Sequence, residues 1–296
     1  MARIVVAGIV NVETTVPVEG LPLAYEPVRY LRDQLCSQVS GVGFNVAGAL
    51  VALGHEVRLA TYLGPDLAGD VARAELSRRG VSGPGVQSTR ATPQSVVLTA
   101  PDGRRSVFTD LKDVPEESFP ASVFAGLLDG ADVGVLSTVG FARSLVPMVQ
   151  ARGLPIAVDV QAAESIDDPY LRDWLAGADI VFASHERLSL PPGEWAQSLL
   201  ARFPAGIVGI GCGADGCMLC VRGEMPRLVP AVAPRGVVST VGAGDALFAA
   251  FLDGRVRGRD PDDAIERAVL YAGWKVGSVG GGDGLLSSAE LDQLSR

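Results

Sequence analysis

The sequence has few of the features that define several classes of protein. No stretch of its 296 residues approaches the ~18 consecutive apolar residues of a membrane-spanning helix, so we expect no membrane partner. The opening, MARIVVAGIVNVETT, lacks the long apolar segment and the cleavage site of a secretory signal peptide, which predicts a cytoplasmic protein. The net charge of −9 argues against nucleic acid as the main partner, although a local pocket could still bind an anionic substrate.

Cysteine is scarce, and four residues of this type do not suggest a disulfide scaffold. Cys212, Cys217 and Cys220 have the C-x4-C-x2-C spacing of plant-type iron–sulfur ferredoxins. The only fourth candidate ligand, Cys36, lies far away in the chain. We therefore favour the alternative, a strand that follows a glycine turn and packs its small sulfur side chains in a core.

Histidine is scarcer still, and two isolated histidines do not make a histidine-rich metal site. We expect His55, which follows the helix-ending Gly54, to cap that helix or to face solvent, and we expect His185 at the surface. A Walker-type phosphate loop is absent. GIGCGA from Gly209 fits a dinucleotide fingerprint, but the strand-like turn after it supplies no ribose-binding acid, so a dehydrogenase is a weak alternative.

The sequence does have a regular alternation of apolar strand-like runs with helix-like stretches. This order predicts an α/β fold in which a largely parallel sheet is covered by helices on both faces. The expected strands span residues 3–9, 56–64, 132–138, 155–160, 179–183 and 206–211, and the expected helices span 44–54, 67–80, 144–153 and 195–203.

Two regions break this alternation. Residues 11 to about 39 contain prolines and short extended pieces without a convincing helix. Residues 94–111 form two alternating runs joined by Pro101, Asp102 and Gly103, a pattern typical of a β-hairpin. Because no linker separates these regions from the rest, we expect a single domain over residues 1–296, with the two segments inserted as a small β-sheet lid.

Small residues precede an aspartate in STVGAGDALF, residues 239–248. The apolar residues behind them predict a helix whose first turn contains Gly242, Ala243, Gly244 and Asp245. Small residues let a ligand approach the backbone, and free N–H groups at the positive end of a helix favour an anion. An aspartate there suits a base that deprotonates a hydroxyl about to attack a phosphoryl group. An aspartate that only stabilises its helix is the alternative, but it does not account for the small residues.

This segment resembles the C-terminal signature of the ribokinase-like (PfkB) family of carbohydrate and nucleoside kinases. Three further stretches resemble family motifs in the expected order: GIVNVE at 8–13, SGVGFNVAGALVALG from Ser40, and YLGPDLAG at 62–69. The resemblance spans nearly the whole chain and implies a ribokinase-like three-layer α/β/α fold, with a mainly parallel sheet and a small β-sheet lid. It also implies ATP with Mg²⁺ as the phosphoryl donor, and a homodimer formed through the lid.

The resemblance implies a role for each matching residue. Asp245 would be the catalytic base, and the backbone of residues 242–244 would form the anion hole for the transferred phosphoryl group. The residues that would contact the substrate, from the body or from the lid, are Asn11, Glu13, Gly41, Gly43 and Asn45. The glycines that would lie under the nucleotide are Gly211, Gly213 and Gly216.

The chain departs from the family pattern at several of these places. Glu13 stands where aspartate is usual, which implies a smaller or differently placed substrate. Val42 stands where ribokinase has a lysine, which argues against the usual recognition of ribose. Ser239 replaces the aspartate that often helps to hold a monovalent cation, which leaves activation by potassium open.

The family's Asn-x-x-Glu motif, which organises Mg²⁺ and phosphate, is also altered. FASHERL offers Ser184, with Glu186 and Arg187 near the expected acid, and Glu186 is the candidate metal residue. This change and Ser239 favour a non-catalytic sugar-binding or regulatory protein that has kept the fold. The intact GAGD favours catalysis, because a binding protein has no use for the base.

The nature of the substrate stays open between a small sugar and a nucleoside. Asn45 and Glu13 favour a polyol, because a site built from such groups rejects ligands that lack hydroxyls. Aromatic residues make up only 6% of the sequence, and no stacking platform for a base is evident. Tyr25 and Tyr30 in the expected lid either supply one or pack the lid sheet. We favour a sugar.

Overall fold

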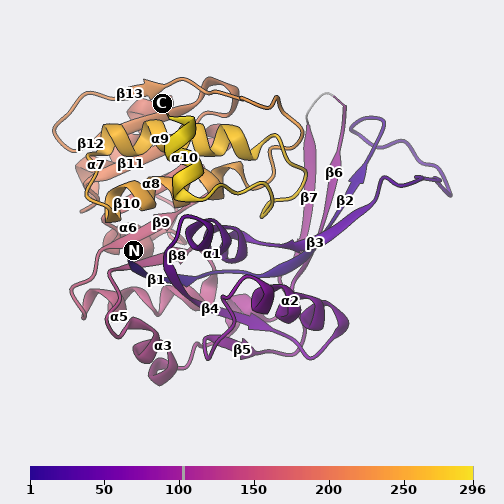
Figure 1. Ribbon diagram of the computed structural model, residues 1–296, viewed down its shortest axis with the longest axis horizontal. Helices are drawn as coiled ribbons and strands as arrows, with labels where there is room; N and C mark the ends of the chain where they lie inside the picture. Colours follow the sequence, from indigo (N-terminus) through magenta and orange to yellow (C-terminus); the bar gives the residue numbers. More distant parts are fainter. Residues whose placement is uncertain (102–103, 296) are drawn as a thin grey trace.

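The computed structural model describes residues 1–101 and 104–295, and its main feature is a large sheet between two layers of helices (Figure 1). In the spatial order given below, every neighbouring pair between β11 and β5 is parallel. β12 and β13 extend the sheet beyond β11 in antiparallel pairs. In spatial order the strands are β13 (Arg227–Val229), β12 (Cys217–Val221), β11 (Ile207–Gly211), β10 (Ile180–Ser184), β9 (Ile156–Asp159), β8 (Val133–Ser137), β1 (Arg3–Ala7), β4 (Glu56–Leu63) and β5 (Val86–Ser88).

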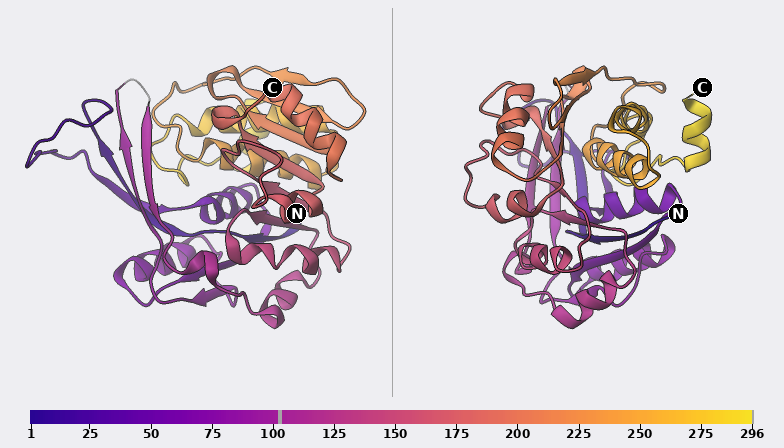
Figure 2. Two further views of the ribbon diagram at one scale, coloured as in Figure 1. Left: turned by 180° about the vertical axis from the view of Figure 1, so that it is seen from behind. Right: turned by 90° about the vertical axis from the view of Figure 1, so that its left-hand side faces the viewer.

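Helices cover both faces of this sheet, as the alternation predicted (Figure 2). One face carries α1 (Val42–Ala52), α2 (Leu67–Arg78), α8 (Ala243–Val256), α9 (Pro261–Lys275) and α10 (Ser288–Leu294). The other carries α3 (Ala121–Leu128), α4 (Gly140–Arg143), α5 (Val146–Gln150), α6 (Arg172–Gly177) and α7 (Pro192–Arg202). Short 3₁₀ turns are η1 (Val114–Glu116), η2 (His185–Arg187) and η3 (Gly213–Asp215).

Strand side chains alternate between two separate hydrophobic cores, one on each face of the sheet. On β12, Cys217 joins the core under α8 and α9, whereas Cys220, three residues further on, joins the opposite core. Cys212 is buried as well, and all four cysteines are free. The prediction that these sulfur side chains pack in a core is therefore confirmed, and the described residues contain no cluster of His, Cys, Asp or Glu suited to a metal ion.

A smaller sheet projects from the main body (Figures 1 and 2). Its strands, in spatial order, are β3 (Cys36–Ser40), β2 (Asn11–Pro17), β6 (Gln94–Thr99) and β7 (Arg105–Asp110). β2 and β6 are parallel, and the two outer pairs are antiparallel. The two regions that break the α/β alternation thus form one sheet, and β6 and β7 are the expected hairpin. Asp102 and Gly103 of its expected turn lie outside the described residues. We call residues 11–40 and 94–110 the lid.

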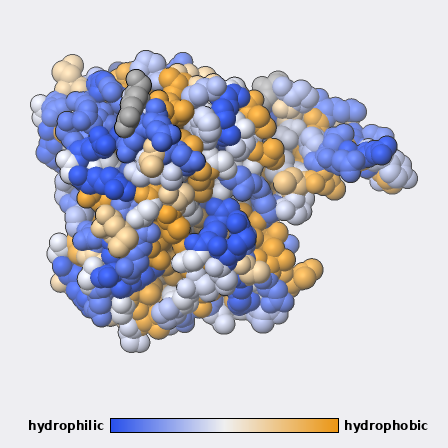
Figure 3. Space-filling model, in the orientation of Figure 1, coloured by the Kyte–Doolittle hydropathy of each residue, from blue (hydrophilic) through white to orange (hydrophobic). Residues whose placement is uncertain are grey.

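Part of the lid surface is apolar and exposed. Val96 and Phe108 pair across β6 and β7 and are 39% and 59% exposed, whereas the next pair includes the buried Val97. Tyr25 and Tyr30 in the loop between β2 and β3 are 92% and 93% exposed, so they do not pack against the lid sheet. Figure 3 shows apolar surface interspersed with hydrophilic surface on the projecting lid.

His55 is buried, which corrects the expectation that it caps a helix or faces solvent. Its Nδ1 accepts a hydrogen bond from the Ala2 N–H at 3.1 Å, so Nε2 carries the proton and donates to Asp253 Oδ1 at 2.9 Å. Asp253 lies fully buried on α8, where Arg257 also donates to it. The sequence could not show this, because Asp253 is 198 residues away. His185 is exposed, as expected.

No helix among residues 1–101 and 104–295 has both the length and the apolar composition needed to cross a membrane.

Candidate active site

A cleft of about 740 Å³ opens between the main body and the lid. Residues just beyond the carboxyl ends of β1, β8 and β9 line one side of it, among them Ile9, Thr138 and Gln161. The strand order reverses at β1, which has β4 on one side and β8 on the other. Open α/β sheets bind ligands beyond the carboxyl ends of their strands at such a reversal, so the topology itself places a ligand site here.

The GAGD segment begins α8 at this cleft. Gly242 is the N-cap with φ 75°, and a Cβ there would lie 2.4 Å from the Gly281 carbonyl oxygen, so only glycine fits. A Cβ on Gly244 would meet no heavy atom within 4 Å. The Ala243 N–H donates to the Thr240 carbonyl at 3.2 Å, whereas those of Gly242 and Gly244 have no backbone acceptor in the described part of the chain. These two N–H groups suit an anion.

Asp245 follows these glycines and lines the same cleft, half-buried. Its Oδ2 accepts a hydrogen bond from Asn45 Nδ2 at 2.7 Å. Burial raises the pKa of Asp245 to about 6, the hydrogen bond from Asn45 and the charge of Lys275 oppose this rise, and the charge of Glu13 adds to it. A carboxyl group with this pKa is mostly ionised at neutral pH and can accept a proton there, as a general base must.

Three polar side chains of the cleft each keep one oxygen without a partner among the described residues: Asn11 Oδ1, Glu13 Oε1 and Asn45 Oδ1. All three side chains are buried. Their other polar atoms are engaged, since Asn11 Nδ2 donates to Ser95 and Glu13 Oε2 accepts from Ser40 at 3.4 Å. A buried acceptor without a donor is unfavourable, so each of these oxygens still lacks a hydrogen bond that an O–H group could supply.

The two glycines expected at the substrate are placed differently. Gly41 lines the cleft with φ 102°, and a Cβ there would lie 2.6 Å from the Ile9 carbonyl oxygen. Gly43 does not line the cleft. A Cβ on Gly43 would lie 2.6 Å from the carbonyl carbon of Gly8, so its glycine lets the start of α1 pack against the segment after β1.

The glycines expected under the nucleotide lie at the end of β11 and around η3, outside the cleft described above. Gly213 and Gly216 have φ 59° and 111°, which favour glycine. Gly211 approaches α8, since a Cβ there would lie 4.0 Å from Leu247 Cδ2. His185 Nδ1 donates to the Gly211 carbonyl at 2.9 Å, so this exposed histidine supports the glycine turn.

Glu186, the candidate metal residue, lies in η2 and faces the lid. Arg105 of β7 reaches it with 3.6 Å between Nη2 and Oε1, so an ion pair joins lid and body. Arg187, near the position of the family's acid, pairs with Glu164 at 3.1 Å. Arg105, Glu164 and Arg187 line the cleft, whereas Glu186 does not.

Asp159 does not line the cleft, but its charge interacts with that of Asp245, and the sequence analysis did not single it out. It ends β9, is 8% exposed, and has its pKa raised to about 7, first by burial and then by the charge of Asp245. Its Oδ1 accepts from the Gln161 N–H at 2.8 Å, and Gln161 has φ 55°, which is unusual for a residue other than glycine. The available signal was an acid at the carboxyl end of a buried parallel strand. Arg105 and Lys275 were missed in the same way, because both approach from distant segments.

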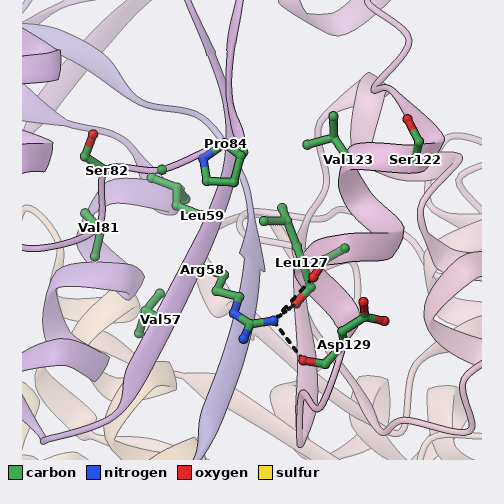
Figure 4. A pocket seen from close by; sticks show the side chains of 13 residues that line it. Val57, Arg58, Leu59, Val81, Ser82, Pro84, Ser122, Val123, Leu127 and Asp129 are labelled. Carbon is green, nitrogen blue, oxygen red and sulfur yellow. Dashed lines mark hydrogen bonds between the residues drawn. The ribbon is translucent and has the colours of Figure 1, made fainter.

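A second pocket of about 500 Å³ lies beside β4 and α3 (Figure 4). Arg58 faces it, but its Nη1 donates to the carbonyls of Leu127 and Asp129 at 2.8 Å each. These carbonyls lie at the end of α3, where unpaired C=O groups need donors. Arg58 therefore caps a helix, and we assign no ligand to this pocket.

Comparisons with known proteins show the family to which the chain belongs. Residues 1–288 match the pfkB family of carbohydrate kinases. The acarbose 7(IV)-phosphotransferase of Actinoplanes sp. is 31% identical over 274 residues, which cover 90% of this chain and 88% of that protein. The ATP-dependent ribose-1-phosphate kinase of Halopiger xanaduensis is 27% identical over 297 residues, which cover 100% and 97% of the two chains.

Solved structures share the fold. The microbiome-derived acarbose kinase Mak1 superposes with a TM-score of 0.87 at 25% identity, over 100% of this chain and 99% of that one. Arabidopsis thaliana ribokinase complexed with ribose and ATP superposes with a TM-score of 0.81 at 21% identity and the same coverage. The chain belongs to the pfkB family of carbohydrate kinases, and it is an ATP-dependent carbohydrate kinase with the expected three-layer fold and small additional sheet. The family generally needs Mg²⁺.

Proposed function

We propose that Asp245 is the base of this kinase. It takes the proton of a substrate hydroxyl while that oxygen bonds to the γ-phosphorus of ATP and the bond between phosphorus and the ADP oxygen breaks. One observation carries the proposal. A carboxyl group with a pKa of about 6 lines one cleft together with Gly242, whose N–H has no backbone acceptor in the described part of the chain, and with three side chains that each hold a buried oxygen without a donor.

The anion hole consists of backbone N–H groups in the segment Gly242, Ala243 and Gly244. Gly242 and Gly244 make its main contacts, because the N–H of Ala243 already donates to Thr240. Donors fixed before the reaction stabilise charge that develops on the transferred phosphoryl group. The adenine nucleotide extends from there toward the glycine turn at Gly211, Gly213 and Gly216, which lets backbone approach the ligand closely.

The substrate is a carbohydrate that hydrogen-bonds Asn11, Glu13 and Asn45 through its hydroxyl groups, with Gly41 close to its ring. The cleft volume lies in the upper part of the usual range for small-molecule sites, about 300–1,000 Å³, so a sugar of more than one ring can fit. A relative with 31% identity is named for acarbose, which supports this size.

A nucleoside is the second candidate, and one observation favours it. Tyr170 lines the cleft with 43% of its surface exposed, and although Arg143 lies over its ring, the exposed part of this aromatic side chain can contact a base. Tyr170→Ala separates the two: a KM that rises for nucleosides but hardly changes for sugars would assign the ring to a base.

Glu186 is the protein acid that would hold Mg²⁺ near the phosphates. Mg²⁺ keeps several waters and uses only one or two protein carboxylates beside substrate phosphates, so a single acid fits. Its oxygen lies 3.6 Å from Arg105, a contact loose enough to exchange. The ion would neutralise phosphate charge when it is bound with ATP.

A homodimer through the lid follows from the exposed apolar pair Val96 and Phe108, which face away from the buried Val97. Sedimentation velocity should show a dimer that Phe108→Asp converts to a monomer. A monomeric wild type at micromolar concentration would contradict this arrangement.

The test of the function is ADP release from ATP and Mg²⁺ over a panel of monosaccharides, oligosaccharides including acarbose, and nucleosides. Asp245→Asn should lower kcat by about 10²- to 10⁴-fold and leave ATP affinity in calorimetry nearly unchanged. Asp260→Asn, the same substitution at an exposed helix cap, is the matched control. Sugar binding without turnover in the wild type would instead favour a binding protein that has kept the fold.

A further inference from the structure

Lys275 is a buried cation at the anion-binding end of α8. It is 0% exposed, ends α9, and its Nζ donates to the carbonyl oxygen of Val241, directly before Gly242. The C-terminal end of a helix favours a positive charge, so α9 helps to hold the ammonium group. The other lysine of the sequence, Lys112, pairs with Asp110 on the lid, and every remaining basic residue is an arginine.

The contact fixes the peptide group between Val241 and Gly242. In a planar trans peptide the C=O and N–H bonds point in opposite directions. A carbonyl that is turned toward Lys275 therefore turns the N–H of Gly242 to the other side, away from α9. The peptide group between Thr240 and Val241 is held as well, because the Ser239 hydroxyl accepts a hydrogen bond from the Val241 N–H at 3.3 Å.

The charged groups that act on Lys275 come from four elements. Asp245 on α8, Asp283 in the loop before α10 and Glu13 on β2 favour its ammonium form, and Arg105 on β7 opposes it. Burial is the largest effect and lowers the pKa of Lys275 to about 8. The side chain therefore stays charged at neutral pH, and together with Asn45 and Arg105 it helps Asp245 to ionise.

We propose that the ammonium group of Lys275 is a tethered monovalent cation, which orients the Gly242 N–H for the phosphoryl group and stabilises the ionised form of Asp245. Lys275 is thus a positioning residue, and it makes a free potassium or sodium ion unnecessary. This inference rests on the proposed function of the cleft.

The chemistry of the position supports a cation of this kind. Ser239 brings no carboxylate with which to hold a free ion, and the Val241 carbonyl oxygen already has a cationic partner. Lysine offers a compact point charge, whereas the broader guanidinium group of arginine demands a planar set of acceptors. In a chain that otherwise prefers arginine, a buried lysine at this carbonyl indicates a need for the smaller cation.

The experiment measures kcat, KM and the acidic limb of the pH–rate profile for the wild type and Lys275→Met, with Lys112→Met as the matched control. Each is assayed in potassium chloride and in choline chloride of equal ionic strength. We expect equal wild-type rates in both salts. Lys275→Met should lose kcat by about 10- to 100-fold and move the acidic limb to higher pH, because Asp245 loses a stabilising charge. Its thermal stability should not fall, since burial disfavours the ammonium group.

Lys275→Ala provides a second variant with space for a small ion. Potassium or ammonium ions should restore part of its kcat and have no effect on the wild type. Strong activation of the wild type by potassium would overturn the proposal. A second outcome would also overturn it: kcat falls in both variants only as far as the amount of folded protein falls, the acidic limb of the pH–rate profile does not move, and potassium and ammonium ions restore no activity.

Failure of the proposed function gives a different result. A wild type without turnover on any substrate would contradict the kinase mechanism but leave Lys275 testable by calorimetry with ATP. Weaker ATP binding by Lys275→Met, restored in Lys275→Ala by potassium, would support the tethered cation. Equal affinities in all variants and salts would overturn it.

Discussion

Asn45 Nδ2 donates to Asp245 Oδ2 at 2.7 Å, a contact between residues 200 positions apart in the sequence. It joins α1 to α8 and opposes the burial that raises the pKa of Asp245. The side-chain oxygen of Asn45, Oδ1, has no partner in the described part of the chain, and the residue lines the cleft. One side chain thus helps to ionise the proposed base and offers an acceptor to the substrate.

Asn45→Ala should move the acidic limb of the pH–rate profile to higher pH. The variant removes a hydrogen bond that favours the ionised form of Asp245, so the pKa rises above about 6. A bond to a charged group contributes enough for a shift of about one pH unit. Rates from pH 4.5 to 9 test this, and a limb that stays in place would argue against Asp245 as the titrating group.

Glu13→Gln should have the opposite effect on the same limb. The charge of Glu13 raises the pKa of Asp245, so its removal lets Asp245 ionise at lower pH, by less than about one unit. KM for the sugar should rise, because Glu13 supplies one of the unpaired acceptors. Measuring kcat at saturating sugar separates the two effects, and a shift to higher pH would contradict this electrostatic relationship.

Alanine should act differently at the two glycines that begin α8. Gly242→Ala should destabilise the fold by about 2 kcal/mol or more, because φ is 75° and the Cβ would clash with the Gly281 carbonyl. Gly244→Ala should leave stability equal or higher, since its Cβ meets open space. It should still lower kcat by about tenfold or more by obstructing the phosphoryl group. Chemical denaturation measures the stability of both variants, and steady-state kinetics measure their kcat. Full activity of Gly244→Ala would contradict the proposed contact between this glycine and the phosphoryl group.

Asp253→Asn should destabilise the protein by about 3 kcal/mol, because His55 and Arg257 lose a buried charged partner. Burial raises the pKa of Asp253, but the hydrogen bonds from His55 and Arg257 outweigh it, so the folded-state pKa lies below 3.8. The ionised Asp253 therefore contributes its full share to the free energy of unfolding above about pH 4. This contribution is lost as the pH falls through the folded-state pKa of Asp253. Denaturation at pH 7 and at pH 3 should show a smaller difference between wild type and variant at pH 3.

Most of the fold could be predicted from the sequence. The strand at β4, the helix α2 and the β6–β7 hairpin follow from apolar periodicity and turn residues within a few positions of each other. The start of α8 was also visible, because small residues followed by an apolar run are a local signal. The prediction for His55 was wrong because it used only local signals. Such signals take no account of the buried Asp253, to which His55 donates a hydrogen bond.

The sequence by itself determined the order of the elements, the two sheets and the aspartate at the start of α8, since short-range patterns encode backbone conformation. Only the tertiary structure decided the chemical state of the site. The raised pKa of Asp159, the hydrogen bond from Asn45 to Asp245 and the ammonium group under Val241 all depend on burial and on distances between remote segments. Electrostatic energy depends on these distances and on exclusion of water, which exist only once the layers and the lid have packed.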